Sequence, residues 1–145
     1  MGEIVCGFVG TGKSSILKYC EGVKSIDLDT AYFKKIAGWE NVYAQCAIAL
    51  TKMYDIVCIT SHAQVMRLLN RHNIKWWLVY PDRSLKLEYK ERAIERGVSE
   101  DFIKVFFDEW DNHISDAQNI TNPNKIVLKS GQYISTVIHK ILRSR

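Results

Sequence analysis

Residues 7–15 read Gly7-Phe8-Val9-Gly10-Thr11-Gly12-Lys13-Ser14-Ser15, after a short apolar run and before a helical segment. They match the P-loop pattern G-x-x-x-x-G-K-[ST] in the strand–loop–helix setting that the pattern requires. Glycines permit positive φ angles, so successive backbone N–H groups can converge on an anion. We therefore predict a nucleoside triphosphate site in which Lys13 contacts the β- and γ-phosphates and the Ser14 hydroxyl ligates Mg²⁺. The predicted nucleotide-binding residues of the loop are Gly7, Gly10, Thr11, Gly12, Lys13, Ser14 and Ser15.

Short apolar runs alternate with longer amphipathic segments along the whole chain. Strands are expected at 3–8, 23–28, 56–60, 75–80 and 125–128. Helices are expected at 13–20, 40–53, 64–71, 85–95, 100–117 and 133–142. Repeated β–α units of this kind predict an α/β fold with a parallel sheet that helices cover on both faces.

Composition bounds the size and class of the protein. The chain has 145 residues, of which 47% are hydrophobic, and a formal net charge of +4. We expect one domain over 1–145, which excludes a large multidomain machine. The small charge gives no reason to expect stable nucleic-acid binding. No apolar run reaches the length of a membrane helix, and the N-terminus lacks a signal sequence, so a cytoplasmic protein is expected.

The second predicted strand ends in Asp27-Leu28-Asp29. Alternation along a strand places both carboxylates on one face, at the strand end where α/β sheets bind ligands. Asp27 could then hold Mg²⁺ through water, and Asp27 or Asp29 could accept a proton from an attacking hydroxyl. The alternative is a turn that Asp29 caps.

The third predicted strand runs into Ser61-His62 without an aspartate at its end. Motor ATPases use an acidic residue there, so its absence counts against that class. Ser61 and His62 would lie beside the P-loop if this strand neighbours the first. They could contact phosphate or substrate, or could be a helix cap and a solvated histidine.

The segment 82–118 is rich in cations and is expected to form a short helical lid. Phosphoryl transfer needs cations around the developing charge, and a mobile segment can supply them on closure. We predict a catalytic role for Arg83, the arginine nearest the strand end, and nucleotide binding by Arg92. A solvated, salt-bridged face is the alternative. Beyond the last strand, the backbone at Gly131 could line the adenine or could serve only as a turn pivot.

Aromatic residues at helical spacing are expected to be core. Phe102, Phe106, Trp110 and Ile114 repeat every four residues, which predicts one buried face of a single helix. Trp39 and Tyr43 could stack on a base, although the same spacing favours burial.

The P-loop, the Asp27-Leu28-Asp29 pair and the arginines after the fourth strand resemble the small P-loop kinases, which include nucleoside monophosphate kinases and shikimate kinases. Ser61-His62, Val79-Tyr80-Pro81-Asp82-Arg83 and Glu91-Arg92 are similar to short nucleotide kinase-like proteins encoded by bacteriophages. The resemblance implies a three-layer P-loop NTPase fold with a five-stranded parallel sheet of order 2-3-1-4-5 and a lid that closes over ATP. In shikimate kinases, a D-x-D after the second strand contacts the acceptor and Mg²⁺-bound water.

These features lead us to expect an ATP- and Mg²⁺-dependent kinase. Its acceptor is expected to be a small molecule, first of all a (deoxy)nucleoside monophosphate. The alternatives are a kinase of a non-nucleotide hydroxyl metabolite and a non-catalytic nucleotide-binding regulatory module. We expect a monomer or homodimer in the cytoplasm, or in the host cytoplasm if a phage encodes it, with no membrane partner.

Overall fold

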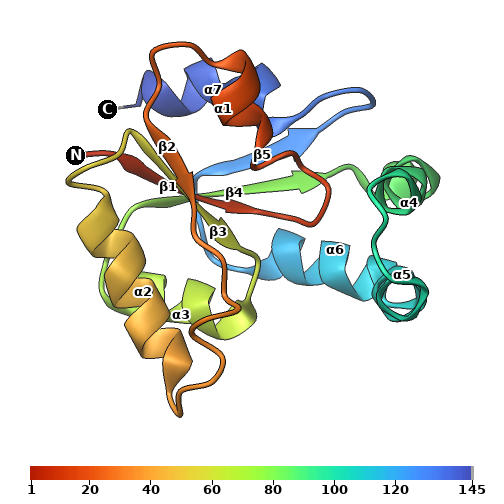
Figure 1. The fold of residues 1–145 in the computed structure, drawn as a ribbon, viewed down its shortest axis with the longest axis horizontal. Coiled ribbons are helices and arrows are strands. Elements are labelled where there is room, and N and C mark those ends of the chain that lie inside the picture. The colour runs from red at the N-terminus through yellow and green to blue at the C-terminus, as the bar shows by residue number, and fades with distance from the viewer. Residues whose placement is uncertain (145) are drawn as a thin grey trace.

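The computed structural model describes residues 1–144, which form one five-stranded sheet and its covering helices (Figure 1). The strands are β1 (Glu3–Gly7), β2 (Ser25–Asp27), β3 (Ile56–Thr60), β4 (Trp76–Pro81) and β5 (Lys125–Leu128). The helices are α1 (Ser15–Tyr19), α2 (Trp39–Leu50), α3 (Ala63–Arg71), α4 (Lys86–Glu95), α5 (Glu100–Asp108), α6 (Trp110–Asn119) and α7 (Ile134–Leu142), with a 3-10 turn η1 (Arg83–Leu85).

All strand pairs are parallel, and the strand order is β2-β3-β1-β4-β5. This confirms the predicted fold class and the order 2-3-1-4-5. Gly7 at the end of β1 lies opposite Thr60 on β3 and Val79 on β4. The carboxyl ends of the three central strands therefore meet where the P-loop begins.

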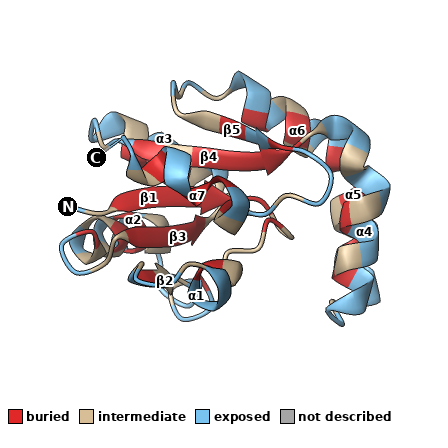
Figure 2. Cartoon of the chain, turned by 90° about the horizontal axis from the view of Figure 1, so that it is seen from above, coloured by how far each residue is buried: buried red, intermediate tan, exposed pale blue. Residues whose placement is uncertain are grey.

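Helices cover both faces of the sheet. On β1, Ile4 and Cys6 belong to the core cluster beneath α2, α3 and α6, whereas Val5 belongs to the cluster beneath α1 and α7. Figure 2 shows the central strands buried, while α4 and α5 project from one end of the sheet with largely exposed surfaces. The strands are apolar without alternation because each face is covered.

The expected single helix at 100–117 is wrong, because two helices occupy this segment. Glu109 leaves helical geometry, with φ −98° and ψ 11°, and separates α5 from α6. Trp110 follows it, is 1% exposed and donates its indole N–H to the Arg83 carbonyl at 2.9 Å. Burying this large side chain and satisfying its N–H redirects the chain although no glycine or proline is present.

Two other elements are shorter than expected. The helix after the P-loop begins at Ser15 rather than at Lys13, and β2 has only three residues. The buried Tyr43 braces this short strand: its hydroxyl donates to the Leu28 carbonyl at 2.6 Å and accepts from the Thr60 N–H at 3.2 Å. Tyr43 is therefore structural. No helix within residues 1–144 is long and apolar enough to cross a membrane.

Candidate active site

The P-loop adopts an anion-binding conformation. Gly10 and Gly12 have φ angles of +83° and +80°, a region that L side chains rarely occupy. The Thr11 N–H donates to the Phe8 carbonyl at 3.2 Å, which closes the turn. By contrast, no residue among 1–144 accepts a hydrogen bond from the backbone N–H of Gly10, Gly12, Lys13 or Ser14. These donors are free to bind an anion.

A cavity of about 470 Å³, here called the P-loop cavity, opens beside this loop. Residues from four parts of the chain border it. They include Gly10, Gly12, Lys13, Ser14 and Ser15 of the loop, Asp27 of β2, Arg92, Glu95 and Arg96 around α4, and Tyr133 before α7. The structure therefore brings together most of the predicted nucleotide-binding residues with one predicted carboxylate.

Asp27 and Asp29 have different surroundings. Asp27 borders the P-loop cavity, where partial burial raises the pKa of its carboxyl group, an effect that Lys13 opposes and Asp29 reinforces. The Asp29 carboxylate instead accepts the Ala31 N–H at 2.9 Å, which is the capping alternative. Asp29 does not border the P-loop cavity. Of these two carboxylates, only Asp27 borders the P-loop cavity.

Two other loop residues, Gly7 and Thr11, pack closely against other residues of the protein. Thr11 is fully buried, its hydroxyl donates to the Phe8 carbonyl at 2.7 Å, and its backbone N–H and carbonyl bond to Phe8 and Ile134, so its contacts stabilise the loop itself. Gly7 gives close packing, because a Cβ there would lie 2.8 Å from the Thr11 Oγ1 atom.

Gly12→Ala tests whether the loop must keep this shape. The added Cβ would lie 2.6 Å from the Tyr133 Cδ1 atom at φ +80°, so the loop or Tyr133 must move. We expect ATP affinity to fall about tenfold or more, equivalent to about 1.4 kcal/mol, when it is measured by calorimetry. Gly22→Ala is the matched control, since its φ is +81° and its Cβ would meet nothing within 4 Å. Both variants should lose about 1–2 kcal/mol of stability, and equal ATP affinity in the two would contradict the prediction.

Arg92 connects α4 to the P-loop. Its guanidinium is stacked between two rings, 4.4 Å from the Tyr89 centroid and 4.1 Å from the Tyr133 centroid, and it donates to the Gly10 carbonyl at 2.8 Å. It also pairs with Glu88 at 3.0 Å, and its side chain is only 12% exposed. Such a planar, always charged group is suited to contact phosphates and rings in this cavity.

Arg83 and Gly131 both lie outside the P-loop cavity. The Arg83 guanidinium donates hydrogen bonds to α6, at 2.9 Å to both the Asp111 Oδ1 and the Ser115 Oγ atoms. Arg83 does not border the P-loop cavity. The catalytic role of Arg83 stays a prediction, and the contacts with α6 do not favour it, because they hold the guanidinium away from the P-loop cavity. Gly131 has φ +74° and its N–H donates to Glu88 at 3.2 Å, so it is a turn pivot whose N–H is already bonded.

A second cavity of about 460 Å³, here called the α5–α6 cavity, lies on the other side of the loop. Lys13 and Val9 border both cavities. The α5–α6 cavity is bordered by the ends of β1 and β3, by Thr30 and Lys34 of the segment before α2, and by side chains of α5 and α6. Lys13 thus stands at the junction of two spaces, each large enough for a small molecule.

Ser61 and His62 border the α5–α6 cavity, as expected for residues beside the P-loop. The His62 ring packs edge-on against Trp39, with centroids 4.9 Å apart, and no residue among 1–144 forms a hydrogen bond with its buried Nδ1 atom. Burial lowers the pKa of His62, which favours the neutral imidazole. His62 therefore borders the cavity as an uncharged ring.

Sequence reasoning missed several bordering residues. Tyr133 and Glu95 belong to the P-loop cavity, and His113 and Asp116 to the α5–α6 cavity. The four residues predicted to form one buried helix face have different surroundings. Trp110 and Ile114 belong to the core, whereas Phe102 and Phe106 border the α5–α6 cavity. Of these residues, only His113 could have been found from the sequence, because it lies seven residues after Phe106, a spacing that places two residues on the same side of a continuous helix. The break at Glu109 hides this relation.

Comparison with known proteins bears on the fold. A solved shikimate kinase from Bacteroides thetaiotaomicron matches with a TM-score of 0.53 and 14% identity, over 90% of this chain and 86% of that one. The chain has a shikimate kinase-like P-loop fold. An uncharacterized protein from Eubacterium ventriosum matches with a TM-score of 0.51 and 14% identity, over 99% of both chains. No protein-family model and no curated protein match the chain.

Proposed function

We propose that this protein is a kinase that transfers the γ-phosphoryl group of ATP to a small acceptor, in the first place a nucleoside monophosphate. The observation that carries the proposal is the position of Lys13, which borders both cavities at the centre of a P-loop. ATP would occupy the P-loop cavity and the acceptor the α5–α6 cavity. The bond between the γ-phosphorus of ATP and the oxygen that bridges it to the β-phosphate would break. A bond from the γ-phosphorus to an acceptor oxygen would form, leaving ADP.

The residues of the loop suit the electrostatics of this transfer. The free N–H groups of Gly12, Lys13 and Ser14 would bind the triphosphate, and the Lys13 ammonium would neutralise charge that develops between the two cavities. Arg92 and Arg96 add positive charge from the α4 side. Catalysis of phosphoryl transfer consists mainly of such positioning and charge stabilisation.

The residues also suit Mg²⁺. Ser14 and Asp27 border the same cavity and offer the oxygen ligands that Mg²⁺ prefers. Within residues 1–144 no three His, Cys, Asp or Glu side chains form a metal site. Two protein oxygens are enough here, because Mg²⁺ at nucleotide sites keeps water and phosphate ligands. Bound Mg²⁺ would supply charge neutralisation at the β- and γ-phosphates.

The α5–α6 cavity supports a monophosphate as the acceptor. Its only Lys and Arg side chains within residues 1–144 are Lys13 and Lys34, which would act as point charges on a phosphate. A hydroxyl metabolite is the second candidate, because the shikimate kinase-like fold and Asp27 at the end of β2 favour it.

A phosphorylation panel tests the proposal. Purified protein would be incubated with ATP and Mg²⁺ and with each nucleoside monophosphate, and with a set of hydroxyl metabolites in parallel. ADP formation that depends on one acceptor, with a matching phosphorylated product, is the expected result. ATP binding without turnover for every acceptor would instead support a regulatory nucleotide-binding module.

A further inference from the structure

The α5–α6 cavity is bordered by side chains of both charges. Lys13 and Lys34 approach it from the P-loop and from the segment before α2. Among the described residues that border the cavity, Asp116 on α6 is the only carboxylate. No hydrogen bond or ion pair joins the Asp116 side chain to another residue within 1–144. Its oxygens are therefore available as hydrogen-bond acceptors.

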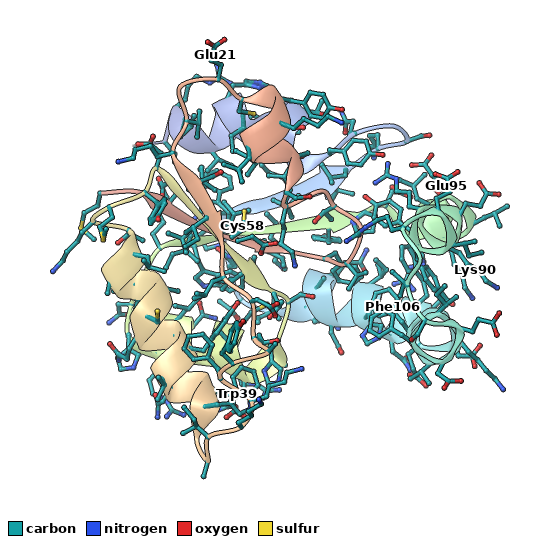
Figure 3. All side chains as sticks on the ribbon, viewed as in Figure 1. Glu21, Trp39, Cys58, Lys90, Glu95 and Phe106 are labelled. Atoms are coloured by element: carbon teal, nitrogen blue, oxygen red, sulfur yellow. The ribbon has the colours of Figure 1, made fainter. Side chains whose placement is uncertain are left out.

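Three stacked rings border the same cavity as Asp116. Phe102 and Phe106 stack with centroids 5.6 Å apart at 10°, and Phe106 and His113 stack with centroids 4.8 Å apart at 20°. Figure 3 labels Phe106 on α5, where this helix approaches α6. Phe106 therefore stacks on one ring of its own helix and on one ring of α6.

Of the three stacked rings, His113 is the one on the same helix as the Asp116 carboxylate. His113 and Asp116 are three residues apart on α6, so they share one side of this helix. Both border the α5–α6 cavity. A planar ring stacked on the His113 imidazole would therefore have its edge close to Asp116.

We propose that His113 and Asp116 form a subsite for the base of the acceptor, and that the base it selects is guanine. This inference rests on the proposed kinase function and names the acceptor of that same site. A carboxylate accepts hydrogen bonds and donates none. Guanine presents N1–H and N2–H₂ side by side, whereas adenine and cytosine place a ring acceptor beside the amino group and uracil flanks its single N–H with carbonyls. Guanine is thus the complement of Asp116.

The charges that border the cavity suit both parts of such a ligand. With the base at Asp116, the phosphate of guanosine monophosphate (GMP) would be bound by Lys34 and Lys13, which border the same cavity. Lys13 also borders the P-loop cavity, so the phosphate oxygens would be directed at the γ-phosphate of ATP. The same arrangement would hold a uracil nucleotide less tightly, because its carbonyl oxygens would face the carboxylate.

Calorimetric titration of the full chain without ATP tests the subsite, with GMP, AMP, CMP and UMP as probes. We expect GMP to bind at least tenfold more tightly than UMP. Asp116→Asn should weaken GMP binding about tenfold, the low end for a charge-assisted hydrogen bond, and change AMP and UMP binding by less than about threefold. Asp111→Asn is the matched control on the same helix, because the Asp111 carboxylate pairs with Arg83 outside both cavities of the site.

His113→Ala separates stacking from base selection. Loss of a stacking partner should weaken all four nucleotides by a similar factor, about fivefold or more. Circular dichroism would verify folding of each variant. Equal affinity for the four probes, or an equal effect of Asp116→Asn on all of them, would overturn the guanine subsite.

Failure of this inference is distinguishable from failure of the kinase proposal. If ATP binds and a hydroxyl metabolite or another nucleotide is phosphorylated, the kinase stands and the guanine subsite is wrong. If GMP binds as expected and no acceptor is ever phosphorylated, the subsite stands and the kinase proposal is wrong.

Discussion

Lys13→Ala should lower kcat for phosphoryl transfer about 10²–10³-fold, the typical cost of removing one preorganised charge-stabilising donor. Lys13 borders both the P-loop cavity and the α5–α6 cavity, so its ammonium is placed where charge develops between donor and acceptor. ATP affinity should fall less than kcat, because the backbone N–H groups of the loop remain. Steady-state kinetics with the acceptor identified by the panel, together with ATP titration by calorimetry, give the two numbers.

Lys52→Ala is the matched control for this experiment. Lys52 follows α2, is exposed and borders neither cavity of the site, so kcat and ATP affinity should stay within about twofold of the wild-type values. A Lys13→Ala variant that loses ATP affinity and kcat by the same small factor would mean that Lys13 only holds ground-state ATP. A variant with unchanged kcat would remove Lys13 from the reaction.

The sequence predicted the P-loop well because the signal is local. Positive φ at Gly10 and Gly12 and the exposed N–H groups follow from residues within one turn. The arginines were harder to rank, since proximity along the chain to β4 favoured Arg83. The position of each arginine around its helical turn decides instead which of them reaches the P-loop. Arg92 lies on the same side of α4 as the buried Tyr89 and therefore contacts the loop. In η1, Arg83 points toward α6.

The α5–α6 cavity could not be predicted from spacing alone. Phe102, Phe106 and Trp110 keep one helical period through the segment, so the sequence indicates one continuous helix. The break at Glu109 depends on a tertiary contact, the hydrogen bond from the Trp110 indole to Arg83. Once α6 turns, His113 stacks on Phe106 from a different helix. A site that arises from such a change of direction leaves no fixed spacing in the chain.

Asp27→Asn should lower kcat/KM about a hundredfold, which is the upper range for loss of a carboxylate that positions metal-bound water. Its pH dependence is more diagnostic. Burial raises the pKa of Asp27, so the active carboxylate is lost at a higher pH than an ordinary aspartate would lose its charge. As pH falls through this raised pKa, the protonated form grows and kcat/KM of the wild type should decline. The Asn variant has no proton to gain there and should lack this acidic limb.

Asp29→Asn sharpens the test, because Asp29 acts on Asp27 only through its charge. That charge raises the pKa of Asp27, while Lys13 and Arg96 lower it. Removing it should move the acidic limb of kcat/KM to lower pH and leave the limb present, at a cost in rate well below that of Asp27→Asn. The Lys13→Ala variant should move any residual limb the opposite way. An acidic limb that persists unchanged in Asp27→Asn would assign it to another group and would remove Asp27 from the catalytic machinery.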